Sequence, residues 1–427
     1  MMRALLEARE WRVRRQKELL AQHGKPLICF TMNIAGPCKH NALIEQGFCI
    51  GCLHLQAQLP RILHEETHPL STGCVGFFVA DAPAADLKQL CVQMEESSAL
   101  GRLFDLDVLD ASGKKLEREQ PRRCLLCNED ARICARNRNH GLEAIIEKTN
   151  AILLEAVQEE KAKKIASAAV RSLLYEVCVT PKPGLVDCEN TGSHKDMDLF
   201  HFLNSASVLQ PYFHQCARIG MEPDTDRLPR LRFAGRQAEA DMRKATKGIN
   251  THKGAIFSLG LACAAAGAVE HWEAKSILDE CAALVQGLCQ QDFASVTAET
   301  AASHGEALYA KYGLTGVRGQ AEAGFPTVLH TGLPILKQGL SLGIHRAGAA
   351  VLLHILRDTA DTSFIARSDP ATLEQTQNEL RTLLEEKPYP DEETLHQWND
   401  RFVSQNLSPG GSADLLALCF FLLFLQE

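Results

Sequence analysis

Residues 180–198 read TPKPGLVDCENTGSHKDMD, and the rest of the chain is organised around this stretch. Pro181, Pro183 and Gly184 predict a stiff turn, because proline locks φ and removes a backbone donor. Carboxylates, an amide, an imidazole and an ammonium group follow the turn, and this combination suits a site for magnesium and phosphate. The alternative is a polar loop in which Asp196 caps the next helix.

Composition excludes several classes of protein. The 427 residues predict two or three domains with ample core, and a net charge of -8 provides no basic surface for nucleic acid. The charged residues 1–22 predict an amphipathic helix and not a signal peptide, and no run of about 18 apolar residues indicates a membrane span. Sixteen cysteines without an export signal indicate reduced thiols, so we expect a cytoplasmic protein without nucleic-acid or membrane partners.

The pattern of apolar residues changes near residue 150. Before it, residues 27–34, 75–81 and 103–110 are predicted strands that alternate with helical stretches, so residues 1–150 should form an α/β or α+β domain. Residues 151–427 are rich in alanine and leucine and keep helical periodicity to the end. We therefore expect an all-α second domain.

Two carboxylates mark the chemistry of the first domain. Asp105 and Asp107 lie two residues apart on a predicted strand, so their side chains point to the same side. They repel each other unless a cation intervenes, and Mg²⁺ on a polyphosphate would serve nucleotidyl transfer, in which an alcohol attacks phosphorus and diphosphate leaves. Arg102, Arg122 and Arg123 could neutralise the phosphates. The alternative is an edge strand with a solvated acidic face.

Cysteines form two groups in the first domain. Cys124 and Cys127, followed by Cys134 and His140, have the ligand types and the first spacing of a structural zinc site, with buried free thiols as the alternative. The second group lies in an apolar, helical context, which favours core thiols: Cys38, His40, Cys49, Cys52 and His54.

Four further polar clusters lie at predicted helix ends of the second domain. A helix N-terminus is a ready anion site, and acids beside it can hold magnesium. Ser412 is the predicted N-cap of the last helix. We expect the clusters to join residues 180–198 in one pocket, with Asp358 and Asp361 as magnesium ligands and with Asn250, Lys253, Arg318, Gly410, Gly411 and Ser412 at the cofactor.

Both domains resemble known families. LICFTMNIAGP, GRLFDLDV and PRRCLLCNEDARICARNRNH resemble the apo-citrate lyase phosphoribosyl-dephospho-CoA transferase family over about residues 1–150. TPKPGLVDCENTGSHKDMDLFHFLNSA, GINTHKGAIFSLGL, YGLTGVRGQAEAGFP and SPGGSADLLAL resemble the triphosphoribosyl-dephospho-CoA synthase family over about residues 165–427. Two positions depart from the second pattern, since Gln320 replaces the usual acid and Ser363 the usual asparagine.

The resemblance implies two consecutive reactions. The second domain would make 2′-(5″-triphosphoribosyl)-3′-dephospho-CoA from ATP and 3′-dephospho-CoA and release adenine. The first would transfer phosphoribosyl-dephospho-CoA to a serine of the citrate lyase acyl carrier protein and release diphosphate. The synthase step needs a base, an acid for adenine and magnesium on the triphosphate. Residue chemistry assigns Asp187, Asp196 and Asp198 to metal or general base, His194 or His252 to the acid, and Lys182, Lys253 and Arg318 to phosphates.

Two alternatives stay open at the level of sequence. The chain could serve malonate decarboxylase, which uses the same prosthetic group, with the first domain a zinc-stabilised docking module for the carrier. The helical domain could instead be a hydrolase that removes ADP-ribose from proteins.

Overall fold

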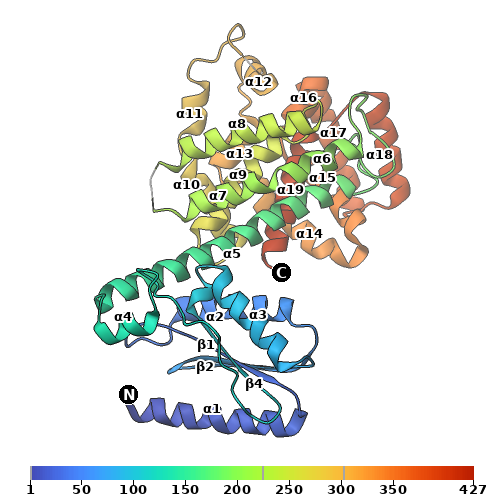
Figure 1. Cartoon of the computed structure of the whole chain (residues 1–427). Helices are drawn as coiled ribbons and strands as arrows, with labels where there is room; N and C mark the ends of the chain where they lie inside the picture. The colour runs from blue at the N-terminus through green and yellow to red at the C-terminus, as the bar shows by residue number, and fades with distance from the viewer. Residues whose placement is uncertain (1, 224–225, 302) are drawn as a thin grey trace. The chain divides into compact units, whose positions relative to one another are not determined.

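The structure, a computed structural model, describes residues 2–223, 226–301 and 303–427. It divides into two compact units, residues 1–160 and 161–427 (Figure 1). Helix α5 (Leu142–Cys178) is one continuous helix that contributes residues to both units.

A four-stranded antiparallel sheet with the order β2-β3-β1-β4 forms the centre of the first unit. The three predicted strands are confirmed as β1 (Leu27–Met32), β3 (Gly73–Ala80) and β4 (Phe104–Leu109). The edge strand β2 (Ile62–Leu70) was not predicted from the sequence. Its polar run HEETH lacks the alternation of apolar and polar residues that is typical of a half-buried strand. An antiparallel sheet with helices on its faces makes this unit α+β.

Helices cover both faces of this sheet. Side chains of β1 alternate, so Ile28 and Phe30 join the core under α2 (Ala42–Gln58), α3 (Ala84–Ser97) and the start of α5. Leu27 and Cys29 join a smaller core under α1 (Met2–His23), on the opposite side of the sheet (Figure 1). The unit also contains η1 (Gly101–Leu103) and α4 (Ala131–Asn137).

In the described part of the second unit, all regular secondary structure is helical, as predicted. Its apolar C-terminal helix α19 (Gly410–Leu425) is buried all round, which confirms the expectation of a core helix, and α9 (Lys253–Ala268) lies beside it. None of the helices within the described ranges is both long enough and apolar enough to cross a bilayer. Besides the end of α5, the helices are α6 (Leu199–Val208), α7 (Gln210–Met221), α8 (Arg227–Ala245), α9 (Lys253–Ala268), α10 (Ala274–Leu284), α11 (Leu288–Phe293), α12 (His304–Tyr312), α13 (Gly316–Glu322), the π-helix η2 (Val328–Gly332), α14 (Leu333–Gly339), the 3-10 helix η3 (Leu340–Leu342), α15 (Ile344–Asp358), α16 (Thr362–Arg367), α17 (Pro370–Glu386), α18 (Glu392–Ser404) and α19 (Gly410–Leu425).

Candidate functional site

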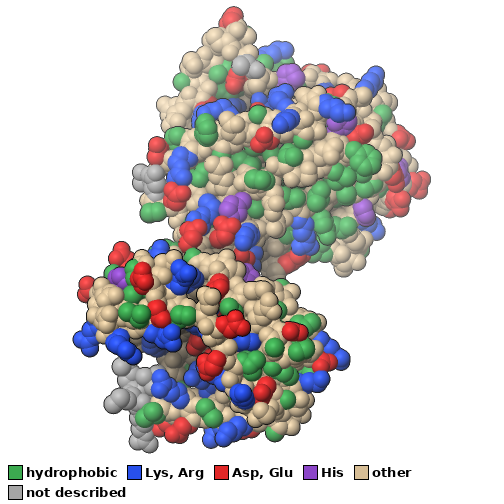
Figure 2. Space-filling model, in the orientation of Figure 1, with side chains coloured by type: hydrophobic (Ala, Val, Ile, Leu, Met, Phe, Trp, Pro, Cys, Tyr) green, Lys and Arg blue, Asp and Glu red, His purple; other side chains and the backbone are tan. Residues whose placement is uncertain are grey.

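The first unit contains a cavity of about 910 Å³ with a strongly cationic lining. Figure 2 shows Lys and Arg side chains gathered around a hollow on this unit. Guanidinium groups match phosphate oxygens in geometry and charge, so the cavity suits a polyphosphate ligand. Its arginines, which include all three that the sequence predicted at the phosphates, are Arg102, Arg118, Arg122, Arg123 and Arg138.

A buried carboxylate of α3 positions the arginines. Arg122 donates from Nη2 to Glu95 Oε1 at 2.7 Å and to Asp105 Oδ1 at 2.8 Å. Burial raises the pKa of Glu95, and the nearby Arg122 acts against this. Glu95 was not predicted from the sequence, although Leu87, Cys91 and Glu95 follow one another at intervals of four residues, which places Glu95 on the buried face of α3.

The paired carboxylates of β4 share one face of the strand, on the side that carries α1. Each has its own cation: Asp105 pairs with Arg122, and Asp107 pairs with Lys115 Nζ at 2.7 Å. Thr31 Oγ1 also donates to Asp105 Oδ2 at 3.4 Å. Within the described residues no third histidine, cysteine or acid joins them in a metal-sized group, so phosphate oxygens would have to complete a magnesium site.

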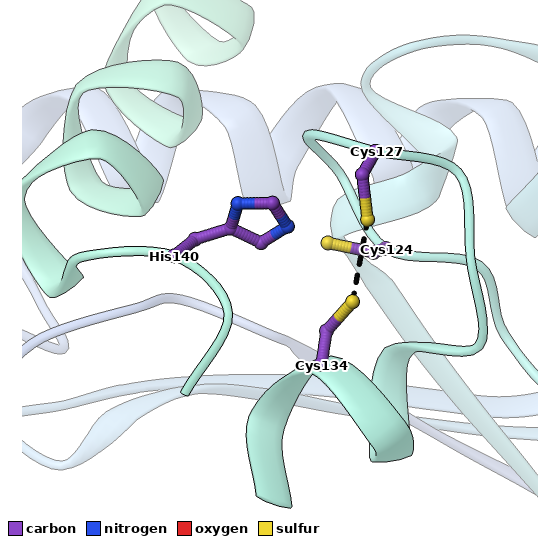
Figure 3. A group of neighbouring side chains, drawn as sticks. All are labelled: Cys124, Cys127, Cys134 and His140. Atoms are coloured by element: carbon purple, nitrogen blue, oxygen red, sulfur yellow. Dashed lines mark hydrogen bonds between the residues drawn. The ribbon is translucent and has the colours of Figure 1, made fainter. Parts of the chain in front are cut away.

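The cysteine motif of residues 124–140 folds into one cluster. The ligand atoms of Cys124, Cys127, Cys134 and His140 all lie within 4.8 Å of one another, and Cys127 Sγ is 3.3 Å from Cys134 Sγ. The His140 ring points toward the sulfur atoms (Figure 3). Its Nε2 is buried and has no hydrogen-bond partner. Three sulfurs and one imidazole nitrogen are a ligand set of tetrahedral zinc.

The second group of cysteines does not form a site. Cys52 lies on the buried face of α2, as expected. The expectation of core thiols is wrong for Cys38 and Cys49, which are exposed, because Cys38 precedes the helix and Cys49 falls on its outer face.

Residues 180–198 form a loop whose polar groups largely bind one another. Lys182 is buried and donates from Nζ to Glu176 Oε1 at 2.6 Å. Asp187 accepts from the backbone N–H groups of Lys182, Glu189 and Asn190 at 2.8–2.9 Å. Lys182 therefore forms an internal ion pair with Glu176, whereas the sequence predicted a phosphate ligand. Asp187 stabilises the loop, whereas the sequence predicted a metal ligand or general base.

Both predicted proton donors to adenine are neutral histidines. His194 lies between Arg367, whose Nη2 donates to Nδ1 at 3.0 Å, and Ser408 Oγ, 2.9 Å from Nε2. Burial and then Arg367 lower the pKa of His194 to about 4. His252 Nδ1 is 2.6 Å from Ser205 Oγ, and burial lowers its pKa to about 3. Near neutral pH neither ring carries the proton that an acid must give.

Asp414 lies in the first turns of α19, and its pKa is shifted upward, whereas the pKa values of the two histidines are shifted downward. Burial, and then the nearby carboxylates of Glu176 and Asp361, raise the pKa of Asp414 well above its ordinary value. Its Oδ2 lies against the first turn of α9, where a Cβ on Gly254 would come within 1.8 Å. A protonated carboxyl group can donate a proton, so Asp414 is a further candidate for the acid, beside the predicted His194 and His252. The signal was an acid directly before the apolar run of a core helix.

Asp361 joins the N-termini of two helices. Its carboxylate accepts from Ser363 N and Phe364 N of α16 at 2.9 and 3.0 Å. It also accepts from Gly411 N, Ser412 N and Ser412 Oγ of α19 at 3.3, 2.7 and 2.8 Å. The predicted N-cap role of Ser412 is wrong, because α19 begins at Gly410 and the carboxylate of a distant segment satisfies its amides. Asp361, the predicted magnesium ligand, therefore binds Gly411 and Ser412, which were predicted to lie at the cofactor.

The remaining candidates lie at other places on the second unit, so the expected clusters do not all converge. Gly410 faces Ser363, Asp358 pairs with Arg357, and Asp198 caps α6 in place of Asp196. Arg318 lines a cavity of about 230 Å³ together with Arg232 and Arg236 and pairs with Asp292 at 2.9 Å. Near this cavity Lys253 Nζ is 3.6 Å from Glu239, and Asn250 Oδ1 accepts from Lys253 N at 3.3 Å.

Comparison with known proteins matches each unit separately. Residues 1–156 match the CitX family model, apo-citrate lyase phosphoribosyl-dephospho-CoA transferase, and residues 162–427 match the CitG model, ATP:dephospho-CoA triphosphoribosyl transferase. Protein CitXG from Haemophilus influenzae is 37% identical over 98% of this chain and 95% of the relative. Protein CitXG from Leuconostoc mesenteroides subsp. cremoris is 34% identical over 98% and 96%. The 2-(5″-triphosphoribosyl)-3′-dephosphocoenzyme-A synthase from Klebsiella pneumoniae is 38% identical over 64% of this chain and 94% of the relative.

Proposed function

Because the chain belongs to the CitXG family, in which a CitX domain precedes a CitG domain, we propose that it catalyses two consecutive steps of citrate lyase prosthetic-group synthesis. The second unit makes 2′-(5″-triphosphoribosyl)-3′-dephospho-CoA from ATP and 3′-dephospho-CoA and releases adenine. The first unit transfers phosphoribosyl-dephospho-CoA to a serine of the citrate lyase acyl carrier protein and releases diphosphate. We place both reactions in the cytoplasm, which agrees with sixteen free cysteines.

The observation that supports this proposal best is that each unit has its own polar centre. The arginine-lined cavity of the first unit suits a polyphosphate, and the second unit gathers Glu176, Lys182, His252 and Asp414 around the first turn of α9. The match of residues 1–156 to a citrate lyase transferase supports citrate lyase over malonate decarboxylase, and an enzyme over a docking module.

For the transfer step, we assign the phosphates to the arginine wall of the cavity. The carrier serine oxygen forms a bond to the α-phosphorus, and the bond from that phosphorus to the departing diphosphate breaks. Asp105 and Asp107 would hold a magnesium ion, which would supply positive charge to the leaving phosphates. Arg122, which lines the cavity, would exchange Asp105 for a phosphate oxygen, and Lys115 would release Asp107 to the metal.

For the synthase step, a ribose hydroxyl of dephospho-CoA attacks C1 of the ATP ribose, and the bond from that carbon to adenine breaks. We assign the proton that adenine needs to Asp414, the acid whose pKa is raised. The exposed Asp196 is the carboxylate of the 180–198 loop that we assign to a magnesium ion on the triphosphate.

The synthase assignment is tested by incubating the full chain with ATP, magnesium and dephospho-CoA and following adenine by chromatography. Adenine that forms only with dephospho-CoA supports the synthase. Adenine that forms with ATP alone indicates the hydrolytic alternative, and no adenine under any metal condition refutes the assignment.

The transfer assignment is tested by the mass of the acyl carrier protein after incubation with the synthase product. The double variant Asp105→Asn, Asp107→Asn should leave the carrier unmodified. Asp110→Asn is the matched control, because Asp110 follows the same strand but binds only its own turn. A docking module would support attachment equally well with either variant, which would refute transfer by this unit.

A further inference from the structure

We propose that Cys124, Cys127, Cys134 and His140 bind one Zn²⁺ ion, and that this zinc centre holds the arginine wall of the 910 Å³ cavity in place. The first statement stands on the geometry of the cluster alone. The second rests on the proposed transfer function, because it predicts which activity depends on the metal.

The backbone of this segment presents all four ligands to one point. Cys124 and Cys127 lie on a tight turn, in which Asn128 N donates to Cys124 O and Asn128 has a φ of 65°. Cys134 follows in the first turns of α4, and His140 comes directly after that helix. In a tetrahedral site with Zn–S bonds of about 2.3 Å, two sulfurs lie roughly 3.8 Å apart, which the cluster accommodates with little movement.

The segment has little hydrophobic packing to hold it without a metal, although Leu125 is half-buried against the core of the first unit. From residue 111 to residue 141, Cys124 and Cys134 are the buried residues, while Leu126 and Ile133 are exposed. Helix α4 has seven residues, too few to be stable through its own hydrogen bonds. The buried, unpartnered Nε2 of His140 also needs a partner. A zinc ion would hold the segment together and would bind His140 Nε2, since metal binding to a site of this kind contributes directly to folding.

The ligands are directly connected to the cationic lining of the cavity. Cys124, Cys134 and His140 line the cavity themselves, and Arg123 and Arg138 are near neighbours of ligands in the sequence. Arg102 donates from Nη2 to the carbonyl oxygens of Arg123 and Cys124 at 2.9 and 2.8 Å. Loss of the metal should therefore release the phosphate-binding wall while leaving the second unit intact.

The metal is tested on the full-length chain by its zinc content and by replacement with Co²⁺. We expect about one zinc per chain and, with Co²⁺, the intense thiolate-to-cobalt absorption of a tetrahedral site. Cys127→Ser and His140→Ala should each lower the zinc content at least tenfold. Cys49→Ser, which removes an exposed cysteine outside the cluster, should leave it unchanged.

The role of the metal is tested by removing zinc with a chelator, which is dialysed away before magnesium is added for both assays. Proteolysis within residues 111–141 should accelerate at least tenfold, and carrier modification should fall at least tenfold, while adenine release by the same sample stays unchanged and shows that the chain is folded. A metal-free chain with a Cys127–Cys134 disulfide would overturn the zinc site. Zinc whose removal alters neither proteolysis nor carrier modification would overturn its role at the cavity. If zinc binds and proteolysis responds but no carrier modification occurs in any sample, the proposed transfer function fails and the zinc site stands.

Discussion

Burial sets the charge of the side chains that matter most in the second unit. Near neutral pH the ring of His252 is neutral, because burial lowers its pKa to about 3. Asp414 keeps its proton more readily than an ordinary carboxyl, because burial and two nearby acids raise its pKa. Burial therefore disfavours the charged form of both groups, which supports the proposal that Asp414 gives the proton to adenine.

Asp414→Asn tests this proposal. The amide keeps the size of the side chain but cannot give up a proton as an acid does, so adenine release should fall by about 10²- to 10⁴-fold. The rate is measured by chromatography of adenine, with Asp400→Asn, an exposed acid on α18, as the control. Adenine release at the wild-type rate by Asp414→Asn would assign the proton to another group.

His252 should make the second unit sensitive to mild acid. The folded-state pKa of about 3 lies below the ordinary value of 6.5, so between these values the unfolded chain binds a proton that the folded chain excludes. Above pH 6.5, His252 does not change the stability of the unit. Below pH 6.5, its exclusion of a proton lowers the free energy of unfolding by about 1.4 kcal/mol for each pH unit. Urea denaturation at pH 7.5 and 5 should show that His252→Gln reduces this slope.

The acid sensitivity of the His252→Gln variant is compared with the effect of two other histidines. His194 has a pKa lowered to about 4, so the His252→Gln variant should keep part of the acid sensitivity. His271→Gln replaces an exposed histidine and should keep the full slope. An unchanged slope in His252→Gln would mean that His252 takes up a proton without unfolding.

At the scale of elements, Asp361 replaces a capping residue for two helices at once. The start of α19 offers free N–H groups, and the carboxylate of Asp361 satisfies them while it also caps α16. The contact joins positions 51 residues apart in the sequence. It therefore fixes the position of the core helix α19, which carries Asp414, relative to α16.

Asp361→Asn should destabilise the second unit by roughly 2–4 kcal/mol, because it removes a buried charge bound by five donors and places an amide N–H₂ among them. Urea denaturation measures the loss. Asp358→Asn is the control, because this exposed acid pairs with Arg357, and should cost less than about 1 kcal/mol. If Asp361 instead binds magnesium, its replacement would raise the magnesium requirement of adenine release and leave stability nearly unchanged.

Local patterns predicted the elements that carry a distinctive sequence of their own. The apolar runs of β1, β3 and β4 and the cysteine motif of residues 124–140 were recognisable, because spacing alone determines them. The polar edge strand β2 was missed, because its sequence lacks a clear alternation. The contact of Asp361 with Ser412 and the charge of Asp414 could not be predicted, because distant segments and burial create them.

At the scale of the whole molecule, the two units have separate cores and separate polar centres. The product of the proposed synthase step is the substrate of the proposed transfer step, and it is a small molecule that can leave one chain and enter another. The two activities should therefore be separable by substitution within full-length chains.

Complementation in a mixture tests this separation. The Asp105→Asn, Asp107→Asn variant should release adenine but leave the carrier unmodified, and Asp414→Asn should do neither from ATP and dephospho-CoA. Because the intermediate can diffuse, a mixture of the two variants should restore carrier modification, with a lag that shortens as the concentration of the first variant rises. Mass spectrometry of the carrier over time measures both. If each variant keeps its remaining activity but the mixture leaves the carrier unmodified, the intermediate does not leave the chain that makes it.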